Sequence, residues 1–332
     1  MAHVTVVIPL YQTETYIGSA LASVLAQTYR DFEVIVVDDG SSDCGPAIAR
    51  NTGDARVRVV TQQNRGLAGA RNTGIRHATG ELVALLDADD LWTPDKLARH
   101  VAHFAGDKAL DVSFSASRLI DETGRDLGLT QAPRDIRLEN ADFFCRNPVG
   151  NGSAPVIRQR ALRAIEFFDA SLGRPCWFDE SFRQSEDIEC WLRLKAKAGC
   201  RFGYVDAALT LYRVNSGGLS ANVEAQLASW RRFRDKVASY APELVATHGA
   251  RAEAYQLRYL ARRAVRSDDR TAALKLAIGA IRLWPRTIIE EPSRTLATIA
   301  AAAAKAALPG NLFGEIERRA LRLAQSRPGL RL

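Results

Sequence analysis

The sequence predicts an α/β protein with a mostly parallel sheet, helices on both sheet faces, and a C-terminal helical appendage. Apolar runs at 4–10, 33–38, 57–61 and 82–86 alternate with helical patterns along the first third of the chain. The runs are continuous rather than alternating, as in strands that are buried on both faces. From about residue 222 the pattern is helical and rich in Ala and Arg, which predicts the appendage.

Composition and charge allow one large domain plus a smaller one. The chain has 332 residues, of which 47% are hydrophobic, so a substantial core can form. The net charge of +7 is unevenly placed: residues 225–332 hold 20 Lys and Arg against 9 Asp and Glu, and residues 1–224 hold 25 against 29. A basic C-terminal third favours an anionic neighbour, although a solvated helical surface explains the charge equally well.

Cysteine usage and hydropathy bear on the compartment. The widely spaced cysteines form no C-x-x-C motif, which fits a reducing cytosol; they are Cys44, Cys145, Cys176, Cys190 and Cys200. Because the N-terminus enters a strand directly, we expect no secretory signal. The longest apolar stretch, 296–308, is interrupted by Lys305 and falls short of the roughly 18–20 residues that a spanning helix needs. We expect a cytoplasmic protein.

Turn and cap signals set the predicted boundaries. Pro9 marks the end of the first strand because proline cannot donate to a central ladder, and Thr13 is placed to cap the next helix. Thr93-Pro94-Asp95 is read as a helix cap, a first-position proline and a first-turn acid. The glycine-rich segment 147–153 has the composition of a loop that closes over a site. Further predicted elements are helices 45–52 and 158–168 and strands 111–118, 201–205 and 208–213.

Three acidic residues follow the apolar run at 82–86: Asp87, Asp89 and Asp90. Carboxylates gathered this closely repel one another unless a cation neutralises them, and hard divalent cations prefer oxygen ligands. In open α/β sheets, ligands bind at the carboxyl ends of strands. The cluster therefore suggests a metal–diphosphate site, although the triplet alone is better explained as an acidic loop that caps the next helix.

A second acidic cluster, Asp38-Asp39, ends another buried strand at the same predicted edge of the sheet. Its sequence, followed by Gly40 and Ser41, is also good turn chemistry. Together with Arg71 in a glycine-rich helix start, the clusters suggest a nucleotide site. The chain contains neither Gly-x-Gly-x-x-Gly after its first strand nor a P-loop, which argues against dinucleotide and P-loop chemistry.

Six segments together resemble family 2 glycosyltransferases over about 1–220. They are Val-Val-Ile-Pro-Leu-Tyr (6–11), Ser-Val-Leu-Ala-Gln-Thr-Tyr (23–29), Val-Val-Asp-Asp-Gly-Ser-Ser-Asp (36–43), Gly-Leu-Ala-Gly-Ala-Arg-Asn-Thr-Gly (66–74), Leu-Leu-Asp-Ala-Asp-Asp (85–90) and Ser-Glu-Asp (185–187). The resemblance implies a GT-A fold with a nucleotide-binding half, about 1–118, and an acceptor half, about 119–220. Residues 221–332 would form a separate basic helical region.

The resemblance also implies roles for single residues at the nucleotide end. Pro9 and Tyr11 would lie against the nucleobase, and Asp39, with Asp38, would contact its uracil end. Arg71 would lie near the base and phosphates.

At the end of the site where the sugar is transferred, Asp87 and Asp89 correspond to the family's Asp-x-Asp motif. Ala88, between them, would contact the nucleotide sugar. The resemblance makes Asp89 the more direct ligand of Mn²⁺ or Mg²⁺. It makes Asp187 the general base and Glu186 its partner, whereas the two acids alone would be read as first-turn stabilisation of a helix dipole.

The implied activity is inverting transfer of one hexose or N-acetylhexosamine from a nucleoside-diphosphate sugar, with UDP favoured. The acceptor would be a glycan, a lipid-linked sugar or a protein, in surface-polysaccharide or glycoconjugate biosynthesis. Asn215 stands where many relatives have histidine, and the Gln-x-x-Arg-Trp signature of processive synthases is absent, so a single transfer is expected.

Other readings stay open. Nucleotidyl transfer and nucleotide-sugar binding without catalysis are the alternatives. The basic helices could hold the chain at the inner face of a membrane or mediate oligomerisation, and no nucleic-acid partner is expected.

Overall fold

The computed structural model describes residues 3–133, 137–214, 223–266, 270–308 and 313. The chain forms two compact units. Of the described residues, the first unit comprises 3–133, 137–138 and 148–214, and the second comprises 139–147, 223–266, 270–308 and 313. The predicted division of the first 220 residues into a nucleotide half and an acceptor half stays a prediction.

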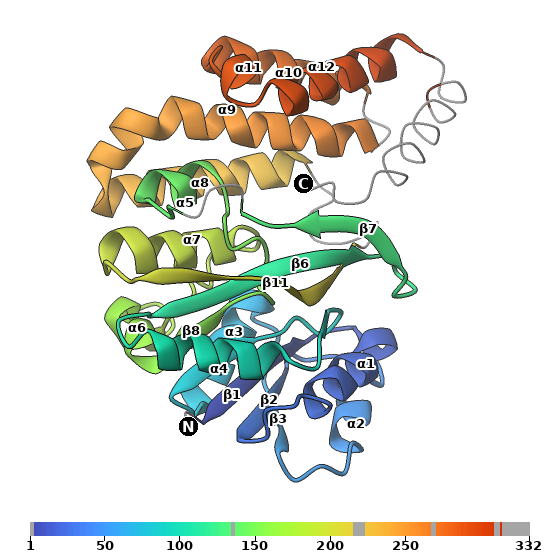
Figure 1. Ribbon diagram of the computed structural model, residues 1–332, viewed down its shortest axis with the longest axis vertical. Coiled ribbons are helices and arrows are strands. Elements are labelled where there is room, and N and C mark those ends of the chain that lie inside the picture. Colours follow the sequence, from blue (N-terminus) through green and yellow to red (C-terminus); the bar gives the residue numbers. More distant parts are fainter. Residues whose placement is uncertain (1–2, 134–136, 215–222, 267–269, 309–312, 314–332) are drawn as a thin grey trace. The chain divides into compact units, whose positions relative to one another are not determined.

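A nine-stranded sheet forms the centre of the first unit, in the order β3-β2-β1-β4-β8-β6-β11-β5, with β7 paired to β6 (Figure 1). The strands are β1 (Val4–Leu10), β2 (Phe32–Asp38), β3 (Val57–Thr61), β4 (Leu82–Leu85), β5 (Leu91–Trp92), β6 (Val112–Ile120), β7 (Asp126–Gln131), β8 (Val156–Arg158) and β11 (Phe202–Arg213). Strands β3, β2, β1 and β4 are mutually parallel, and β11 is parallel to β6. This confirms the predicted fold class.

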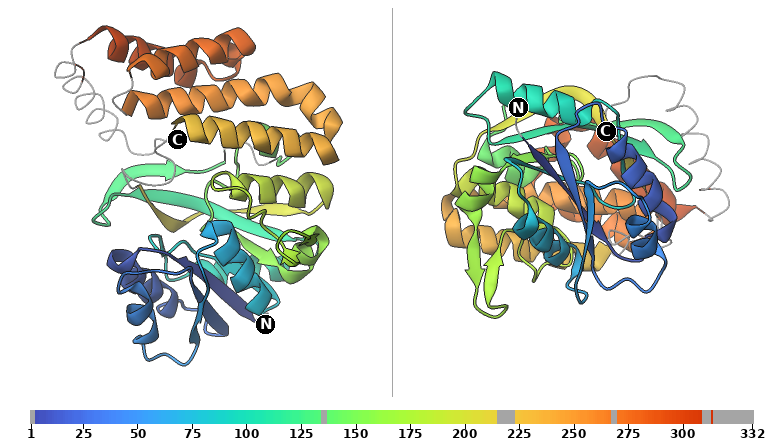
Figure 2. Two further views of the ribbon diagram at one scale, coloured as in Figure 1. Left: turned by 180° about the vertical axis from the view of Figure 1, so that it is seen from behind. Right: turned by 90° about the horizontal axis from the view of Figure 1, so that it is seen from below.

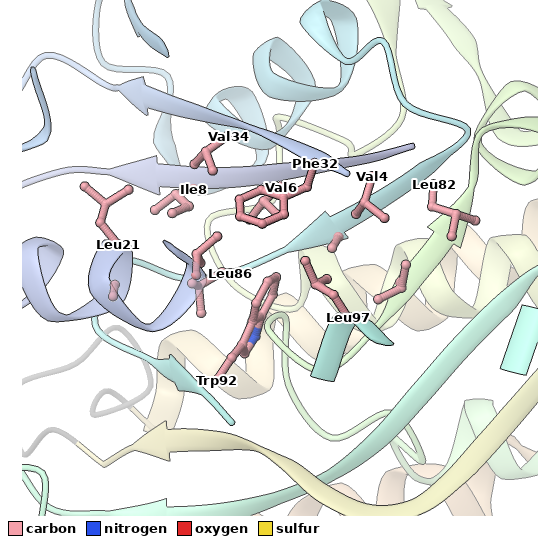
Figure 3. Packing of buried hydrophobic residues seen from close by; sticks show 14 of the residues in the cluster. Val4, Val6, Ile8, Leu21, Phe32, Val34, Leu82, Leu86, Trp92 and Leu97 are labelled. Carbon is pink, nitrogen blue, oxygen red and sulfur yellow. The ribbon is translucent and has the colours of Figure 1, made fainter. Parts of the chain in front are cut away.

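Helices cover both faces of this sheet (Figure 2). Side chains of β1 at even positions, such as Val6 and Ile8, pack with Leu21 and Leu97 in one buried cluster (Figure 3). Side chains at odd positions of β1 point to the other face of the sheet. On that face Val7 lies so close to Gly74 that a Cβ added to residue 74 would overlap the Val7 side chain. The helices are α1 (Glu14–Leu25), α2 (Gly45–Arg50), α3 (Gly66–His77), α4 (Lys96–Gly106), α6 (Gln159–Ile165) and α7 (Glu186–Leu192). The continuous apolar runs thus bury both faces of each central strand.

The first strand, β1, runs from Val4 to Leu10, the range that the sequence predicts, and Pro9 is its second-to-last residue. Leu86 N donates to Val7 O, so the odd positions of β1 present their backbone groups to β4. Pairing with β4 stops at Val7, and the missing N–H of Pro9 therefore faces no partner strand.

Both predicted threonine caps are wrong. Thr13 occupies the cap position of α1, but its hydroxyl makes no cap hydrogen bond; Asp43 Oδ2 instead accepts from Glu14 N at 2.8 Å. Helix α4 begins at Lys96 rather than after Thr93, and Asp95 occupies its cap position without a side-chain cap hydrogen bond.

The last predicted strand pair is one strand. β11 runs unbroken from Phe202 to Arg213 and absorbs irregular register shifts against β6 between Val205 and Thr210. The remaining pair, β9 (Phe167–Asp169) and β10 (Arg174–Cys176), forms an antiparallel hairpin.

The second unit is helical. Its elements are α5 (Asn140–Cys145), α8 (Val223–Tyr240), α9 (Pro242–Arg266), α10 (Arg270–Leu283), α11 (Thr287–Glu290) and α12 (Pro292–Ala307). Helices α9 and α12 begin at Pro242 and Pro292, and Pro285 lies between α10 and α11. Among the described helices, none is long and apolar enough to cross a membrane.

Candidate active site

The acidic turn after β4 is held by backbone and side-chain hydrogen bonds. Asp90 N donates to Asp87 O at 3.0 Å, which closes the turn. Asp87 N donates to Ser153 Oγ at 2.9 Å. The carboxylate of Asp87 is thus presented at the carboxyl end of the central strand, where the sequence placed it.

Arg71 joins this turn to a distant part of the chain. It lies on α3, is 1% exposed, and donates from Nη2 to Asp87 Oδ1 at 2.7 Å and from Nη1 to Glu186 Oε1 at 2.8 Å. Burial by itself lowers the pKa of Arg71, but the two carboxylates outweigh it and raise the pKa above its usual value. Three predicted site residues, from α3, the end of β4 and α7, therefore meet in one ion-pair network.

Asp187 follows Glu186 in the first turn of α7. The turn begins at Ser185, whose backbone is left-handed, with φ of 65°. Burial and the neighbouring Glu186 raise the pKa of Asp187 to about 7, although Arg71 and the hydrogen bond from Ile188 N lower it. A carboxyl group with this pKa can exchange a proton near neutral pH.

The third acid of the cluster, Asp90, is fully buried and internally satisfied. Its Oδ2 accepts from Ser153 Oγ at 2.6 Å and its Oδ1 from Arg213 N at 2.8 Å. Burial, followed by the charges of Asp89 and Asp87, raises the pKa of Asp90 well above its ordinary value. Asp90 therefore anchors the turn, and Arg213 Nε, which donates to Asp89 O at 2.7 Å, holds the next peptide.

The second acidic cluster has the turn and cap functions that its sequence allowed. Asp39 Oδ1 accepts from Arg65 N at 2.8 Å, and Oδ2 accepts from Gly66 N at 2.8 Å, so Asp39 caps α3. Asp38 Oδ1 accepts from Ser41 N at 2.9 Å and closes the turn. Among the described residues, no hydrogen bond or ion pair links Asp38 or Asp39 to the network around Arg71.

The remaining predicted residues differ in accessibility. Tyr11, just past the end of β1, is 49% exposed, so its ring is available to a ligand. Pro9 is buried in the strand, and Ala88 is buried between the two acids of the motif.

Several residues that hold the site were not singled out from the sequence. Asn72 binds the segment before α7: its Oδ1 accepts from Trp177 N at 3.0 Å and Phe178 N at 2.8 Å, and its Nδ2 donates to Phe178 O. A Cβ at Gly152 would overlap Arg71 Nη2, so this glycine is needed for the loop to approach the ion pair. The glycine-rich composition of 147–153 was the available signal for the loop.

The donor set is compatible with a cation that also binds a substrate. The described residues include no group of three or more His, Cys, Asp or Glu side chains that could hold a metal by themselves. Mg²⁺-type sites commonly use one or two carboxylates and complete their shell with water and substrate phosphates. The partly exposed carboxylates of Asp87 and Asp89 fit that arrangement. Asn215 lies outside the described residues.

The strand-end carboxylates and the buried arginine lie at the edge where open α/β sheets bind their ligands. Residues 5–165 match the family described as glycosyl transferase family 2. An Escherichia coli relative, the UDP-Glc:alpha-D-GlcNAc-diphosphoundecaprenol beta-1,3-glucosyltransferase WfgD, is 38% identical over 66% of this chain and 80% of its own length. This chain belongs to glycosyl transferase family 2.

Other relatives are longer. An uncharacterized glycosyltransferase of Rickettsia felis is 30% identical over 64% of this chain, but the match covers only 33% of its own length. An uncharacterized glycosyltransferase of Nostoc, alr2836, is 38% identical and is matched over 52% of its length. The chain thus spans a third to a half of these proteins.

Solved structures share the fold. The mannosyltransferase PcManGT from Pyrobaculum calidifontis, in complex with GDP-Man and Mn²⁺, has a TM-score of 0.58 and 24% identity, covering 92% of this chain and 87% of that one. TarS 1–349 of S. aureus, in complex with UDP, has a TM-score of 0.55 and 18% identity, covering 96% and 92%. These likenesses confirm the GT-A fold.

Proposed function

We propose that this chain transfers a single sugar from a nucleoside-diphosphate sugar to an acceptor hydroxyl, with inversion at the anomeric carbon. The observation that carries the proposal is the buried Arg71, which binds Asp87 of the strand-end motif and Glu186 of α7 at once. This contact fixes the donor end of the site relative to the first turn of α7, where Asp187 lies.

Asp187 is proposed as the general base. One-step inversion needs a carboxylate that removes the acceptor proton as the sugar is transferred. Glu186 is paired with Arg71, whereas the one hydrogen bond that Asp187 accepts from a described residue is the local one from Ile188 N. Its raised pKa supports proton transfer near neutral pH.

Asp89 and Asp87 are proposed to hold Mn²⁺ or Mg²⁺. A divalent cation at this place would stabilise the negative charge that develops on the diphosphate leaving group. The presence of Mn²⁺ with GDP-Man in the mannosyltransferase complex supports this assignment. Arg71 adds a fixed positive charge beside the same motif.

The nucleobase is proposed to lie near Tyr11, Pro9 and Asp39. Tyr11 offers an exposed ring at the end of β1. Asp39 accepts three hydrogen bonds, from Gln62 Nε2, Arg65 N and Gly66 N, and a carboxylate has about four acceptor sites. Among the described residues, these donors leave about one acceptor site of the buried Asp39 for a base N–H, while Asp38 supports the turn.

A UDP-hexose donor and a lipid-linked acceptor are the chemistry favoured by the relatives. WfgD and WfaP of Escherichia coli are both described as transferring from UDP-Glc to GlcNAc-diphosphoundecaprenol. TuaG of Bacillus subtilis is described as a putative teichuronic acid biosynthesis glycosyltransferase. We extend this class of reaction, in polysaccharide biosynthesis, to the present chain.

A donor screen tests the proposal. Calorimetric binding of UDP-, GDP- and dTDP-sugars is measured with Mn²⁺, then with EDTA, and again after Mn²⁺ is restored. We expect one UDP-sugar to bind, EDTA to weaken binding, and Asp89→Ala to lose the Mn²⁺ dependence. Asp206→Ala, an exposed change in the same unit, is the control. Release of pyrophosphate from a nucleoside triphosphate, without sugar transfer, would favour a nucleotidyltransferase instead.

A further inference from the structure

A stripe of cationic and aromatic side chains runs along α9 of the second unit. Arg251, Tyr255, Arg258 and Arg262 are spaced three or four residues apart, so they lie on one face of the helix. Arg251 Nε donates to Glu290 Oε2 at 3.2 Å, and Arg258 donates to Glu291 and, at 2.8 Å, to Thr295 Oγ1. The stripe therefore meets acids contributed by α11 and the residue before α12.

Both of these acids already have partners. Glu291 binds Arg258 through one oxygen and Arg146 Nη1, at 2.7 Å, through the other. Glu290 accepts from Arg251, from the hydroxyl of Tyr255, and from Trp284 Nε1 at 3.2 Å. Among the described residues, neither glutamate forms a hydrogen bond or an ion pair with Arg262.

Arg262 comes one turn after Arg258, and its guanidinium is bound to neither of these two glutamates. It makes no hydrogen bond or ion pair with any described residue, and its Nε is enclosed without a partner. Burial, followed by the positive charges of Arg258 and Arg294, lowers the pKa of Arg262 to about 10. Its place in the stripe thus brings it beside other arginines.

A guanidinium that is partly removed from water beside like charges is costly unless an anion compensates it. The negative charge of Glu291 acts on Arg262 as well, but its effect is smaller than the repulsion from Arg258 and Arg294. A planar guanidinium binds a phosphate through two parallel N–H donors, and adjacent arginines strengthen such binding.

We propose that Arg262, flanked by Arg258 and Arg294, binds a phosphate group on the second unit, at a site separate from the one around Arg71. Phosphate is carried both by anionic lipid headgroups and by small soluble ions, and the chemistry of recognition is shared. The proposal does not depend on the identity of the transferred sugar.

The test compares the full-length chain with Arg262→Gln, Arg262→Lys and the matched control Arg282→Gln, an exposed arginine of α10. In the first arm, equilibrium dialysis measures inorganic phosphate binding at constant ionic strength. In the second, the protein is sedimented with phosphatidylcholine vesicles that contain or lack phosphatidylglycerol, at low and moderate salt. Circular dichroism verifies that each variant is folded.

We expect Arg262→Gln to weaken phosphate or anionic-vesicle binding by about tenfold or more, since a charge-assisted hydrogen bond is lost. Arg262→Lys should retain part of the binding, and Arg282→Gln should match the wild type. Loss in the dialysis arm identifies a soluble phosphate, and loss only with phosphatidylglycerol vesicles identifies a lipid headgroup. Equal binding by wild type and Arg262→Gln in both arms, or an equal loss in Arg282→Gln, would overturn the proposal. If Arg262→Gln fails to fold, the binding of Arg262→Lys is compared with that of the wild type in both arms, and equal binding would overturn the proposal.

Discussion

Arg71 shows how one side chain can organise a site from three separate elements. Its guanidinium is removed from water and its charge is balanced by Asp87 and Glu186. Removing one partner of such a buried group leaves an uncompensated charge, at a cost of about 3–5 kcal/mol. The arrangement ties the first turn of α7, which carries Asp187, to the acidic turn. Burial and then Glu186 raise the pKa of Asp187, and Arg71 lowers it.

The pKa of Asp187 predicts the pH dependence of transfer. A general base must be deprotonated, and burial with Glu186 places the pKa of Asp187 at about 7. kcat/KM should therefore rise with pH, pass its half-maximal value near 7 and level off above it. A pH–rate profile measured with saturating metal checks this; a profile that stays flat through neutral pH would remove Asp187 from the role of base.

Gly152 predicts a steric effect on the same ion pair. The Cβ of Gly152→Ala would overlap Arg71 Nη2 and lie 3.1 Å from Asp87 Oδ2, so the loop or the arginine must shift. We expect a loss of about 1–3 kcal/mol of unfolding free energy by denaturant titration, together with reduced donor turnover. Gly106→Ala, where a Cβ would meet nothing within 4 Å, is the control and should change stability by less than about 0.5 kcal/mol.

At the scale of elements, α7 is fixed by a buried ion pair. Arg193 Nε lies 2.9 Å from Glu189 Oε1, both side chains are at most 3% exposed, and Nη1 donates to Ile165 O at 2.6 Å. Arg193 also donates to Trp177 O, so the pair ties α7 to α6 and to the segment that Asn72 holds. These contacts position α7, and therefore also its first turn with Glu186 and Asp187.

Breaking this pair should be costly. Arg193→Met leaves Glu189 buried without its partner, and we expect a loss of about 3–5 kcal/mol in unfolding free energy. The double variant Glu189→Leu with Arg193→Met should recover part of that loss. The exposed pair Asp95–Arg99 has the same four-residue spacing, and Arg99→Met should cost less than about 1 kcal/mol. Equal losses at the two sites would show that burial does not govern the effect.

The sequence was sufficient for elements whose signal is local. The continuous apolar runs predicted β1 to β4 and their shared edge, and the first-turn acids predicted the start of α7. It was insufficient where tertiary contacts decide: Asp43, not Thr13, serves the start of α1. The register shifts that let β11 run unbroken depend on its pairing with β6.

The candidate site was predictable to a similar extent. The six motifs predicted that Arg71, Asp87 and Glu186 belong to one site. Only the fold shows that the guanidinium of Arg71 binds both acids. Asn72 and Gly152 act through packing and backbone hydrogen bonds, which leave no distinct residue pattern.

At the scale of the whole molecule, the chain combines a GT-A unit with a helical unit that has its own core. That core includes Ala261, Ala264, Ala273 and Ala302, with Phe313 packed among them. Alanine allows these helices to pack closely. Many basic residues of the C-terminal third lie on the described helices α8 to α12, while the acidic clusters belong to the sheet of the first unit.

The central claim is that the first unit transfers a sugar with Asp187 as the base. The most direct test measures sugar transfer from a UDP-sugar to a lipid-linked acceptor by wild type and Asp187→Asn, with donor binding measured in parallel. The account predicts that Asp187→Asn binds the donor like the wild type but transfers the sugar roughly 10²- to 10⁴-fold more slowly. Transfer by Asp187→Asn at close to the wild-type rate would contradict it.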